Sequence, residues 1–149
     1  MPGPRNGERT ILVVDDDPDI LQTLALCLST EGYRVLMASN GKEALDMLAR
    51  ERPSAILLDL MMPVMDGWQF VAEIEKRGIR KAPLLILSAD RAVQGHAAKL
   101  RAEGHLAKPF DLDELLGKVQ QLTGGPSGGH HAAPAAYNAV MRPDDPVIG

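Results

Sequence analysis

Polar side chains that could act together on a metal ion and a phosphate follow four apolar runs of this sequence. They are Asp15, Asp16, Asp17, Asp59, Ser88 and Lys108. Each stands at or just past the end of a run with the composition of a buried β-strand. In an open parallel α/β sheet the carboxyl ends of the strands lie side by side, and ligands bind there. We therefore expect carboxylates, a hydroxyl and an ammonium to share one crevice, a set that suits a divalent cation and a phosphoryl group.

The acidic groups of this crevice need a counter-charge. If the carboxylates of Asp15, Asp16 and Asp59 lie close together, they repel one another, and at least one of them should have a raised pKa. Mg²⁺ relieves such repulsion, because it prefers a few hard oxygen ligands together with water. Ordinary alternatives stay open at this point. The acidic run could cap the following helix, and Asp59 could be a turn residue.

Apolar runs alternate with amphipathic segments, and this alternation predicts the elements that must hold the crevice. Strands are expected over residues 10–14, 34–38, 54–59, 84–88 and 105–107. Helices are expected over residues 18–31, from Asn40 onward, from Asp66 to about Arg77, over residues 91–102, and from Asp111 to about Leu122. Crossovers between parallel strands are right-handed, so these helices must cover both faces of one sheet. The pattern predicts an α/β fold with a doubly wound, five-stranded parallel sheet.

Three of the expected helices begin with capping signals. Asn40 is followed three residues later by Glu43, and Asp111 by Glu114, which is the spacing of a capping box. Asp66 is a typical N-cap residue, because its side chain can accept a hydrogen bond from an unpaired N–H of the first turn. These signals predict where the helices start.

Composition and charge narrow the class of protein. The chain has 149 residues, a formal net charge of −4 and dispersed basic residues, so we expect no direct nucleic-acid binding. Cys27 is the only cysteine, which excludes an intramolecular disulfide and suits a reducing compartment. No apolar run approaches the ~18 residues that span a bilayer, and Met1–Thr10 lacks a signal-peptide core. We expect a cytoplasmic protein without membrane contacts.

The chain divides into one domain and two ends. We expect a flexible N-terminus over residues 1–8, a domain over residues 9–123, and a disordered Gly/Pro/Ala-rich tail over residues 124–149. The tail has no helical or strand period and little apolar content to bury. Its His130-His131 pair is expected to be solvated rather than metal-bound. Its apolar pairs, Val140-Met141 and Val147-Ile148, would be short docking contacts if the tail were not disordered throughout.

Four segments resemble the receiver domain of two-component response regulators. They read ILVVDDDP at 11–18, LLDLMMPVMDG at 57–67, LILSA at 85–89 and LAKPF at 106–110. Their order and spacing make the resemblance specific, and it covers residues 8–123. It implies a flavodoxin-like (βα)5 fold with the strand order 2-1-3-4-5.

The resemblance also implies a set of metal ligands. Asp16 and Asp59 would bind Mg²⁺ directly, and the backbone carbonyl of Met61 would be the third protein ligand. Asp15 would act mainly through water. These are hard oxygen donors of the kind that Mg²⁺ prefers.

The resemblance further implies a phosphorylated aspartate. The Asp59 carboxylate would be the nucleophile that accepts the phosphoryl group, a form of covalent catalysis. Lys108 and the metal would neutralise charge on the phosphoryl oxygens, and the Ser88 hydroxyl would donate to one of them after transfer. In the family the bond matching Lys108–Pro109 is cis, and we expect the same here. The ordinary alternatives are a serine that merely ends a strand and a solvated loop lysine.

The sequence departs from the common family pattern in two places. His105 stands where the family usually has Tyr or Phe as a switch residue, and an imidazole is smaller and titratable. The spacing from Ser88 to Lys108 is about two residues shorter than usual, so the fourth helix or the loop after it must be trimmed. We expect Ser88 and His105 to form the switch, and the alternative is that His105 is exposed and inert. The trimmed region usually carries the switch and the partner contacts, so the sequence leaves the mode of output open.

The function implied by the resemblance is a phosphorylation-controlled switch in two-component or phosphorelay signalling. We expect a stand-alone, single-domain regulator that is not an enzyme beyond catalysing its own phosphotransfer and dephosphorylation. Its donor would be the phosphohistidine of a sensor histidine kinase or histidine phosphotransfer protein. That donor would dock on the first helix, residues 18–31. The output would pass to a downstream protein whose identity the residues do not indicate.

Three other classes of protein compete with this interpretation. A degenerate receiver would serve only as a constitutive docking module, and the intact pocket speaks against it. A flavodoxin would need a Ser/Thr/Gly-rich phosphate loop where this chain has three aspartates, which repel phosphate without a metal. A phosphatase with an aspartyl nucleophile usually has a second Asp two residues on, where Met61 stands here.

Overall fold

Five parallel strands form the centre of the protein, as the alternation of apolar runs predicts. The computed structural model describes residues 9–80, 82–126 and 140–141. The central strands are β1 (Thr10–Val14), β2 (Arg34–Ala38), β3 (Ala55–Asp59), β4 (Leu84–Ser88) and β5 (Gly104–Ala107). They lie in the order 2-1-3-4-5, and every pairing is parallel. The expected fold class and strand order are confirmed.

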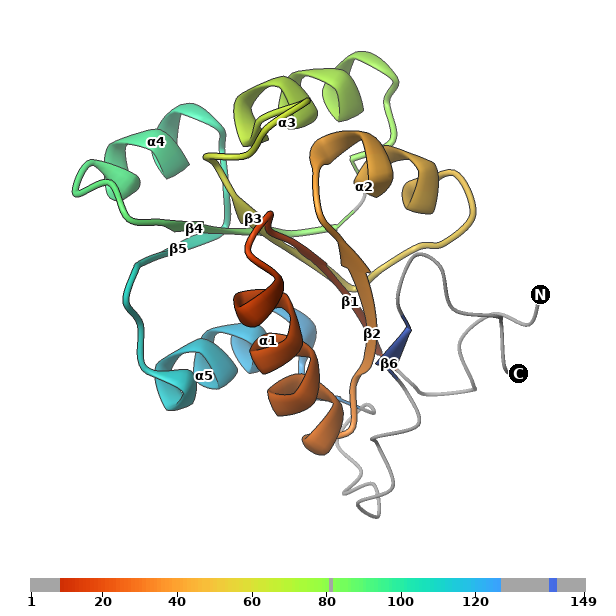
Figure 1. Cartoon of the computed structure of the whole chain (residues 1–149), viewed down its shortest axis with the longest axis vertical. Coiled ribbons are helices and arrows are strands. Elements are labelled where there is room, and N and C mark those ends of the chain that lie inside the picture. Colours follow the sequence, from red (N-terminus) through yellow and green to blue (C-terminus); the bar gives the residue numbers. More distant parts are fainter. Residues whose placement is uncertain (1–8, 81, 127–139, 142–149) are drawn as a thin grey trace.

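The helices cover the two faces of this sheet. They are α1 (Pro18–Thr30), α2 (Gly41–Leu48), α3 (Gly67–Lys76), α4 (Val93–Lys99) and α5 (Leu112–Thr123). Helices α2, α3 and α4 lie on one face and α1 and α5 on the other (Figure 1). Leu12 and Val14 pack with the first group, while Ile11 and Val13 pack with the second. Strand β1 is therefore buried on both faces, as expected from the apolar residues at 11–14.

A sixth, two-residue strand extends the sheet beyond the expected five. Strand β6 (Val140–Met141) pairs in parallel with the outer edge of β2, at Val35 and Leu36. The expectation of disorder across residues 124–149 did not include it. An edge strand has free N–H and C=O groups that another segment can pair with, and this backbone pairing needs no sequence period.

The described chain continues past α5 and returns to the start of the domain. Helix α5 ends at Thr123, and its C-cap residue Gly124 has the positive φ typical of the end of a helix. The Arg9 N–H then donates to the Pro126 carbonyl oxygen at 2.9 Å. Residues 124–126 therefore lie against the start of the domain. The expectations for residues 1–8, for His130-His131 and for Val147-Ile148 lie outside the described residues.

Helix α4 is shorter than the pattern over residues 91–102 predicts. It has seven residues, the fewest of the helices described, and its N-cap residue Ala92 makes no side-chain capping bond. After it, Arg101 has a positive φ, and the Arg80 guanidinium binds the carbonyl oxygens of Leu100 and Arg101. This short helix agrees with the shortened spacing between Ser88 and Lys108. None of the described helices is long and apolar enough to cross a bilayer.

Candidate functional site

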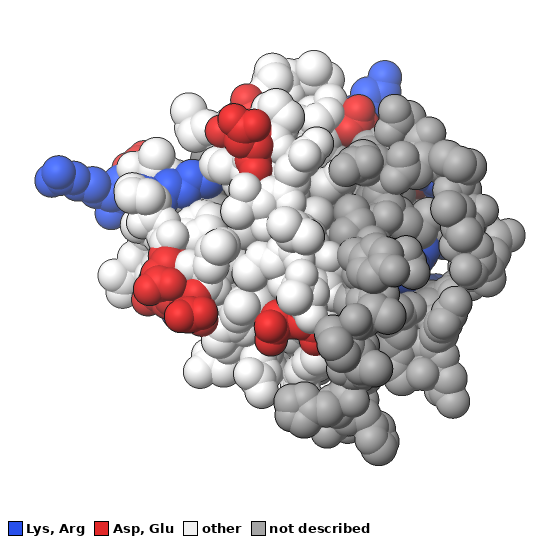
Figure 2. Space-filling view, turned by 60° about the horizontal axis from the view of Figure 1, so that its bottom comes forward, with Lys and Arg blue, Asp and Glu red and all other residues white. Residues whose placement is uncertain are grey.

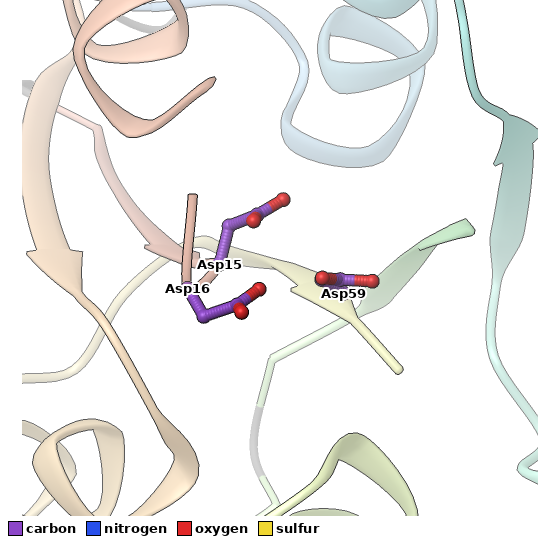
Figure 3. Close-up of side chains that lie close together, drawn as sticks. All are labelled: Asp15, Asp16 and Asp59. Atoms are coloured by element: carbon purple, nitrogen blue, oxygen red, sulfur yellow. The ribbon is translucent and has the colours of Figure 1, made fainter. Parts of the chain in front are cut away.

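The acidic cluster forms where β1 and β3 end side by side. Val14 pairs with Leu58, so Asp15 and Asp59 follow at the same level of the sheet. Carboxylate oxygens of Asp15, Asp16 and Asp59 all lie within 4.8 Å of one another. Figure 3 shows the three side chains gathered at the carboxyl ends of these two strands. The sequence-based expectation that these groups converge is confirmed.

The three aspartates after β1 have different surroundings. Asp17 caps α1, because its side chain accepts from the Asp19 N–H at 2.9 Å. The helix-capping alternative therefore accounts for Asp17 alone. Asp15 is fully buried, and one of its carboxylate oxygens accepts from the Asp17 N–H at 2.9 Å. Asp16 is exposed, so its carboxylate borders both the cluster and solvent.

Lys108 is the cation of the cluster. Its Nζ lies 2.7 Å from Asp15 Oδ2 and 3.5 Å from Asp59 Oδ2. The lysine backbone N–H donates to the Ser88 carbonyl oxygen at 2.8 Å, which ties its position to the end of β4. The Lys108–Pro109 peptide bond is cis, as the resemblance implies. The alternative of a freely solvated loop lysine does not fit these contacts.

Asp59 has an unusual protonation equilibrium. The side chain is 5 % exposed, and its Oδ1 accepts from the Met61 N–H at 3.2 Å. Burial, followed by the charge of Asp15, raises the pKa of Asp59 from 3.8 to about 6, although the Lys108 ammonium and the Met61 N–H both lower it. The expected raised carboxyl pKa therefore belongs to Asp59. The cluster has more negative charge than its single lysine balances.

These residues fit a divalent cation of the hard type. The donors are carboxylate oxygens, two of them on nearly buried residues, and the surplus negative charge disfavours the cluster without a cation. Soft or nitrogen ligands are absent from the set, which disfavours zinc or copper. The cluster could hold Mg²⁺.

The loop after Asp59 is held close to the cluster by α3. A Cβ at Gly67 would lie 2.7 Å from Leu60 Cα, and the Gly67 N–H donates to the Leu60 carbonyl oxygen at 3.0 Å. Only glycine permits this close approach. Between them the Met61 side chain is 70 % exposed while its N–H binds Asp59. The Met61 carbonyl as a metal ligand stays a prediction.

The two expected switch residues lie on neighbouring strands. Ser88 ends β4 and is buried, and its hydroxyl oxygen accepts from the Asp90 N–H at 3.1 Å. His105 is half-buried on β5 and pairs with Ile86. Its neighbour Leu106 packs on the α1 and α5 side, so strand alternation directs His105 to the opposite face. Their switching role stays a prediction.

Sequence reasoning missed a group of side chains beside Ser88. The Asp90 carboxylate binds the Ala92 N–H at 2.8 Å and His96 Nε2 at 3.0 Å, and the His96 ring stands edge-on to Trp68, with 5.1 Å between ring centroids. Asp90 six residues before a histidine is no recognised motif. Only the place of Asp90, shortly after the expected end of a strand at Ser88, could have drawn attention to it.

Known proteins resemble this chain in sequence along most of the described domain. The family model described as the response regulator receiver domain matches residues 11–120. The response regulator MprA of Mycolicibacterium vanbaalenii is 42% identical over 114 residues, which cover 75% of this chain and 49% of MprA. The chain thus spans about half the length of the curated relatives that it matches.

Solved structures of receiver domains resemble the protein in fold. The receiver domain of the Francisella response regulator 1452 has a TM-score of 0.72 and 32% identity, covering 78% of this chain and 97% of that one. The response regulator TrrA of Thermotoga maritima, solved in complex with Mg²⁺-BeF, has a TM-score of 0.68 and 34% identity, covering 76% and 98%. The acidic cluster at the strand ends, the strand order and the match over residues 11–120 agree, and the chain belongs to the response regulator receiver domain family.

Proposed function

We propose that this protein is a phosphorylation-controlled switch in two-component or phosphorelay signalling, with Asp59 as the phosphoacceptor. The observation that carries the proposal is the crowding of the Asp15, Asp16 and Asp59 carboxylates, two of which, Asp15 and Asp59, contact the Lys108 ammonium. Asp59 Oδ2 lies 3.5 Å from Lys108 Nζ and Asp59 Oδ1 accepts from the Met61 N–H, so both oxygens of this carboxylate are held within the site.

Mg²⁺ is the cofactor proposed for this cluster. Asp16, Asp59 and the Met61 carbonyl would bind it directly, and Asp15 would act mainly through water. When bound, the ion supplies positive charge that offsets the negative charge of the carboxylates and of the phosphoryl oxygens. Asp15 also holds Lys108 in place through the 2.7 Å ion pair, which keeps the ammonium next to Asp59.

The proposed reaction transfers a phosphoryl group from a phosphohistidine. A carboxylate oxygen of Asp59 attacks phosphorus, an O–P bond forms and the P–N bond to the donor breaks. The donor imidazole leaves with the electron pair and takes up a proton. The Lys108 ammonium faces the oxygens that carry the developing charge, and its distance of 3.5 Å from Asp59 Oδ2 supports this role.

The signal would then pass through Ser88 and His105. The Ser88 hydroxyl accepts from Asp90, so its own proton is available for a phosphoryl oxygen. His105 lies on the α4 side of the sheet and would turn in response. Because an imidazole gains less from burial than a phenol or phenyl ring, we expect a weaker turn than in a receiver with Tyr or Phe there.

The phosphodonor, a sensor histidine kinase or a histidine phosphotransfer protein, is proposed to dock over α1. This helix contains no Lys or Arg, and Leu26 on its outer side is 63 % exposed. On the side of the molecule where α1 and α5 lie, uncharged surface separates a few acidic groups (Figure 2). A cytoplasmic location and an unidentified downstream protein complete the proposal.

The deciding experiment is phosphorylation by acetyl phosphate with and without Mg²⁺, followed by intact mass. The wild-type protein should gain one labile phosphate only with Mg²⁺. Asp59→Asn should gain none, and the matched control Asp46→Asn, an exposed aspartate on α2, should match the wild type. Labelling of Asp59→Asn at the wild-type rate would contradict the assignment. No labelling of the wild type would favour the degenerate receiver.

A further inference from the structure

The loop between β4 and α4 is held by a chain of contacts that begins at Ser88. The Asp90 N–H donates to the Ser88 hydroxyl oxygen at 3.1 Å. One Asp90 carboxylate oxygen accepts from the Ala92 N–H at 2.8 Å, and the other lies 3.0 Å from His96 Nε2. A carboxylate can only accept, so Nε2 of His96 carries the shared proton. The chain thus runs from a residue of α4 to the hydroxyl at the end of β4.

Trp68 holds the other side of the His96 ring. The two rings are edge-on, with an interplanar angle of 84° and 5.1 Å between centroids, a favourable aromatic geometry. Trp68 lies on α3, whose first turn is fixed by a complete capping box between Asp66 and Gln69. Helices α3 and α4 lie beside each other on one face of the sheet (Figure 1). The imidazole is therefore held between a rigid helix start and Asp90.

Helix α4 has few other means of fixing its first turn. Its N-cap residue, Ala92, offers no side-chain acceptor, and the helix has only seven residues. The hydrogen bonds from Ala92 and His96 lower the pKa of Asp90, in that order of importance, so they favour its ionised form. The loop conformation then depends on the Asp90 carboxylate, which His96 orients.

We propose that His96 is a positioning residue for Ser88: it holds the Asp90 carboxylate, and through it the backbone N–H that orients the Ser88 hydroxyl. This inference rests on the proposed function, in which that hydroxyl donates to a phosphoryl oxygen on Asp59. If the loop is an ordinary turn, the Asp90–Ala92 bond alone holds it, whereas the positioning role also requires the contact from His96. Replacing His96 distinguishes these two alternatives, because it removes the imidazole and leaves the Asp90–Ala92 bond.

The first measurement needs no phosphate. Amide hydrogen exchange of Asp90 and Ala92 is compared in the wild type, His96→Leu, His96→Gln and the control Gln94→Leu, an exposed position on the same helix. Loss of one hydrogen bond to a carboxylate should speed exchange in His96→Leu by about fivefold. His96→Gln, which keeps a donor, should restore most of the protection. Exchange in His96→Leu equal to that in Gln94→Leu would overturn the proposal.

The second measurement is the affinity for beryllofluoride, a phosphoryl mimic, determined at saturating Mg²⁺ by titration calorimetry. His96→Leu should bind beryllofluoride about threefold more weakly than Gln94→Leu, with His96→Gln in between and Mg²⁺ affinity equal in all. If His96→Gln is as impaired as His96→Leu, packing on Trp68 is what matters and the positioning role is wrong. If the wild type binds no beryllofluoride, the proposed function fails, while the exchange experiment still decides the role of His96 in the loop.

Discussion

Two buried ionic groups lie at opposite ends of the same sheet, and they differ in their charge balance. At one end, Arg34 at the start of β2 and Glu51 after α2 form a 2.8 Å ion pair with side-chain exposures of 9% and 7%. At the other end, three carboxylates share one ammonium, that of Lys108. The first group pairs each charge with its opposite. The second has a surplus of negative charge.

This difference distinguishes an ion pair that stabilises the fold from a cluster that can bind a cation. The Glu51 carboxylate is already matched by the Arg34 guanidinium, so this pair needs no cation from outside the chain. The repulsion within an unbalanced cluster is relieved by a cation from outside the chain. The raised pKa of Asp59 comes first from burial and then from the charge of Asp15, which is the contribution of this imbalance.

The balanced pair should matter most for folding. Glu51→Ala removes the 2.8 Å charge-assisted hydrogen bond of a nearly buried pair and should lower the free energy of unfolding by about 3 kcal/mol. Urea denaturation measures this, with the exposed Glu114→Ala on α5 as the control. Mg²⁺ affinity should stay at the wild-type value. A loss of Mg²⁺ binding in folded Glu51→Ala would mean that the two ionic groups are coupled.

Removing a charge from the unbalanced cluster should have the opposite effect and stabilise the protein. Without Mg²⁺ at pH 8, Asp59→Asn should raise the free energy of unfolding by about 2 kcal/mol, because it removes a carboxylate that is costly to ionise in the fold. Urea denaturation with a chelator present measures the gain. A destabilised Asp59→Asn would contradict the imbalance.

Comparison with Asp59→Asn also tests how the stability of the protein depends on pH. The folded protein keeps a proton on Asp59 up to about pH 6, whereas the unfolded chain loses it near 3.8. This contribution therefore favours the fold at low pH, and it is lost as pH rises through 4 to 6. Wild-type stability relative to Asp59→Asn should fall across that window and level off above it. At saturating Mg²⁺, the stability of the wild type relative to Asp59→Asn should change less with pH.

Metal affinity should depend on the exposed member of the cluster. Asp16→Ala removes a charged oxygen that Asp15 and Asp59 cannot replace, and Mg²⁺ should bind at least about tenfold more weakly. The metal-free protein should be unchanged or slightly more stable, because repulsion is reduced. Titration calorimetry checks the affinity, with Asp17→Ala as the control that loses only a helix cap. An unchanged Mg²⁺ isotherm for Asp16→Ala would exclude the ligand role.

The smallest expected changes concern the groups that respond to phosphate. Lys108→Ala should leave Mg²⁺ affinity equal or up to about threefold stronger, since a nearby cation is lost. Its amide exchange over residues 84–110 should no longer respond to acetyl phosphate. Ser88→Ala should still be phosphorylated but respond weakly. A full wild-type exchange response in either variant would contradict the role of that residue.

The local features were readable from the sequence because they depend on neighbours along the chain. The apolar runs ending in Asp15 and Asp59 predicted two buried strands, and the strands end at the expected residues. The predicted helix starts were correct, but the predicted capping bonds were only partly correct. Asn40 does accept from the Glu43 N–H, but the Glu43 carboxylate binds Ser39 instead of Asn40. A capping residue predicts a helix start, while the bonds it makes depend on the surrounding packing.

Tertiary structure decided the features that join distant segments. The Lys108–Asp15 contact spans 93 residues of sequence, and the pKa of Asp59 follows from the burial and charge created where strands meet. Strand β6 depends on a free sheet edge, and the His96–Trp68 contact depends on how α4 packs beside α3. Residue types and local periods specify which groups end each strand. Distances, desolvation and shared protons arise only when the strands and helices pack, because these quantities belong to pairs of residues that the sequence keeps apart.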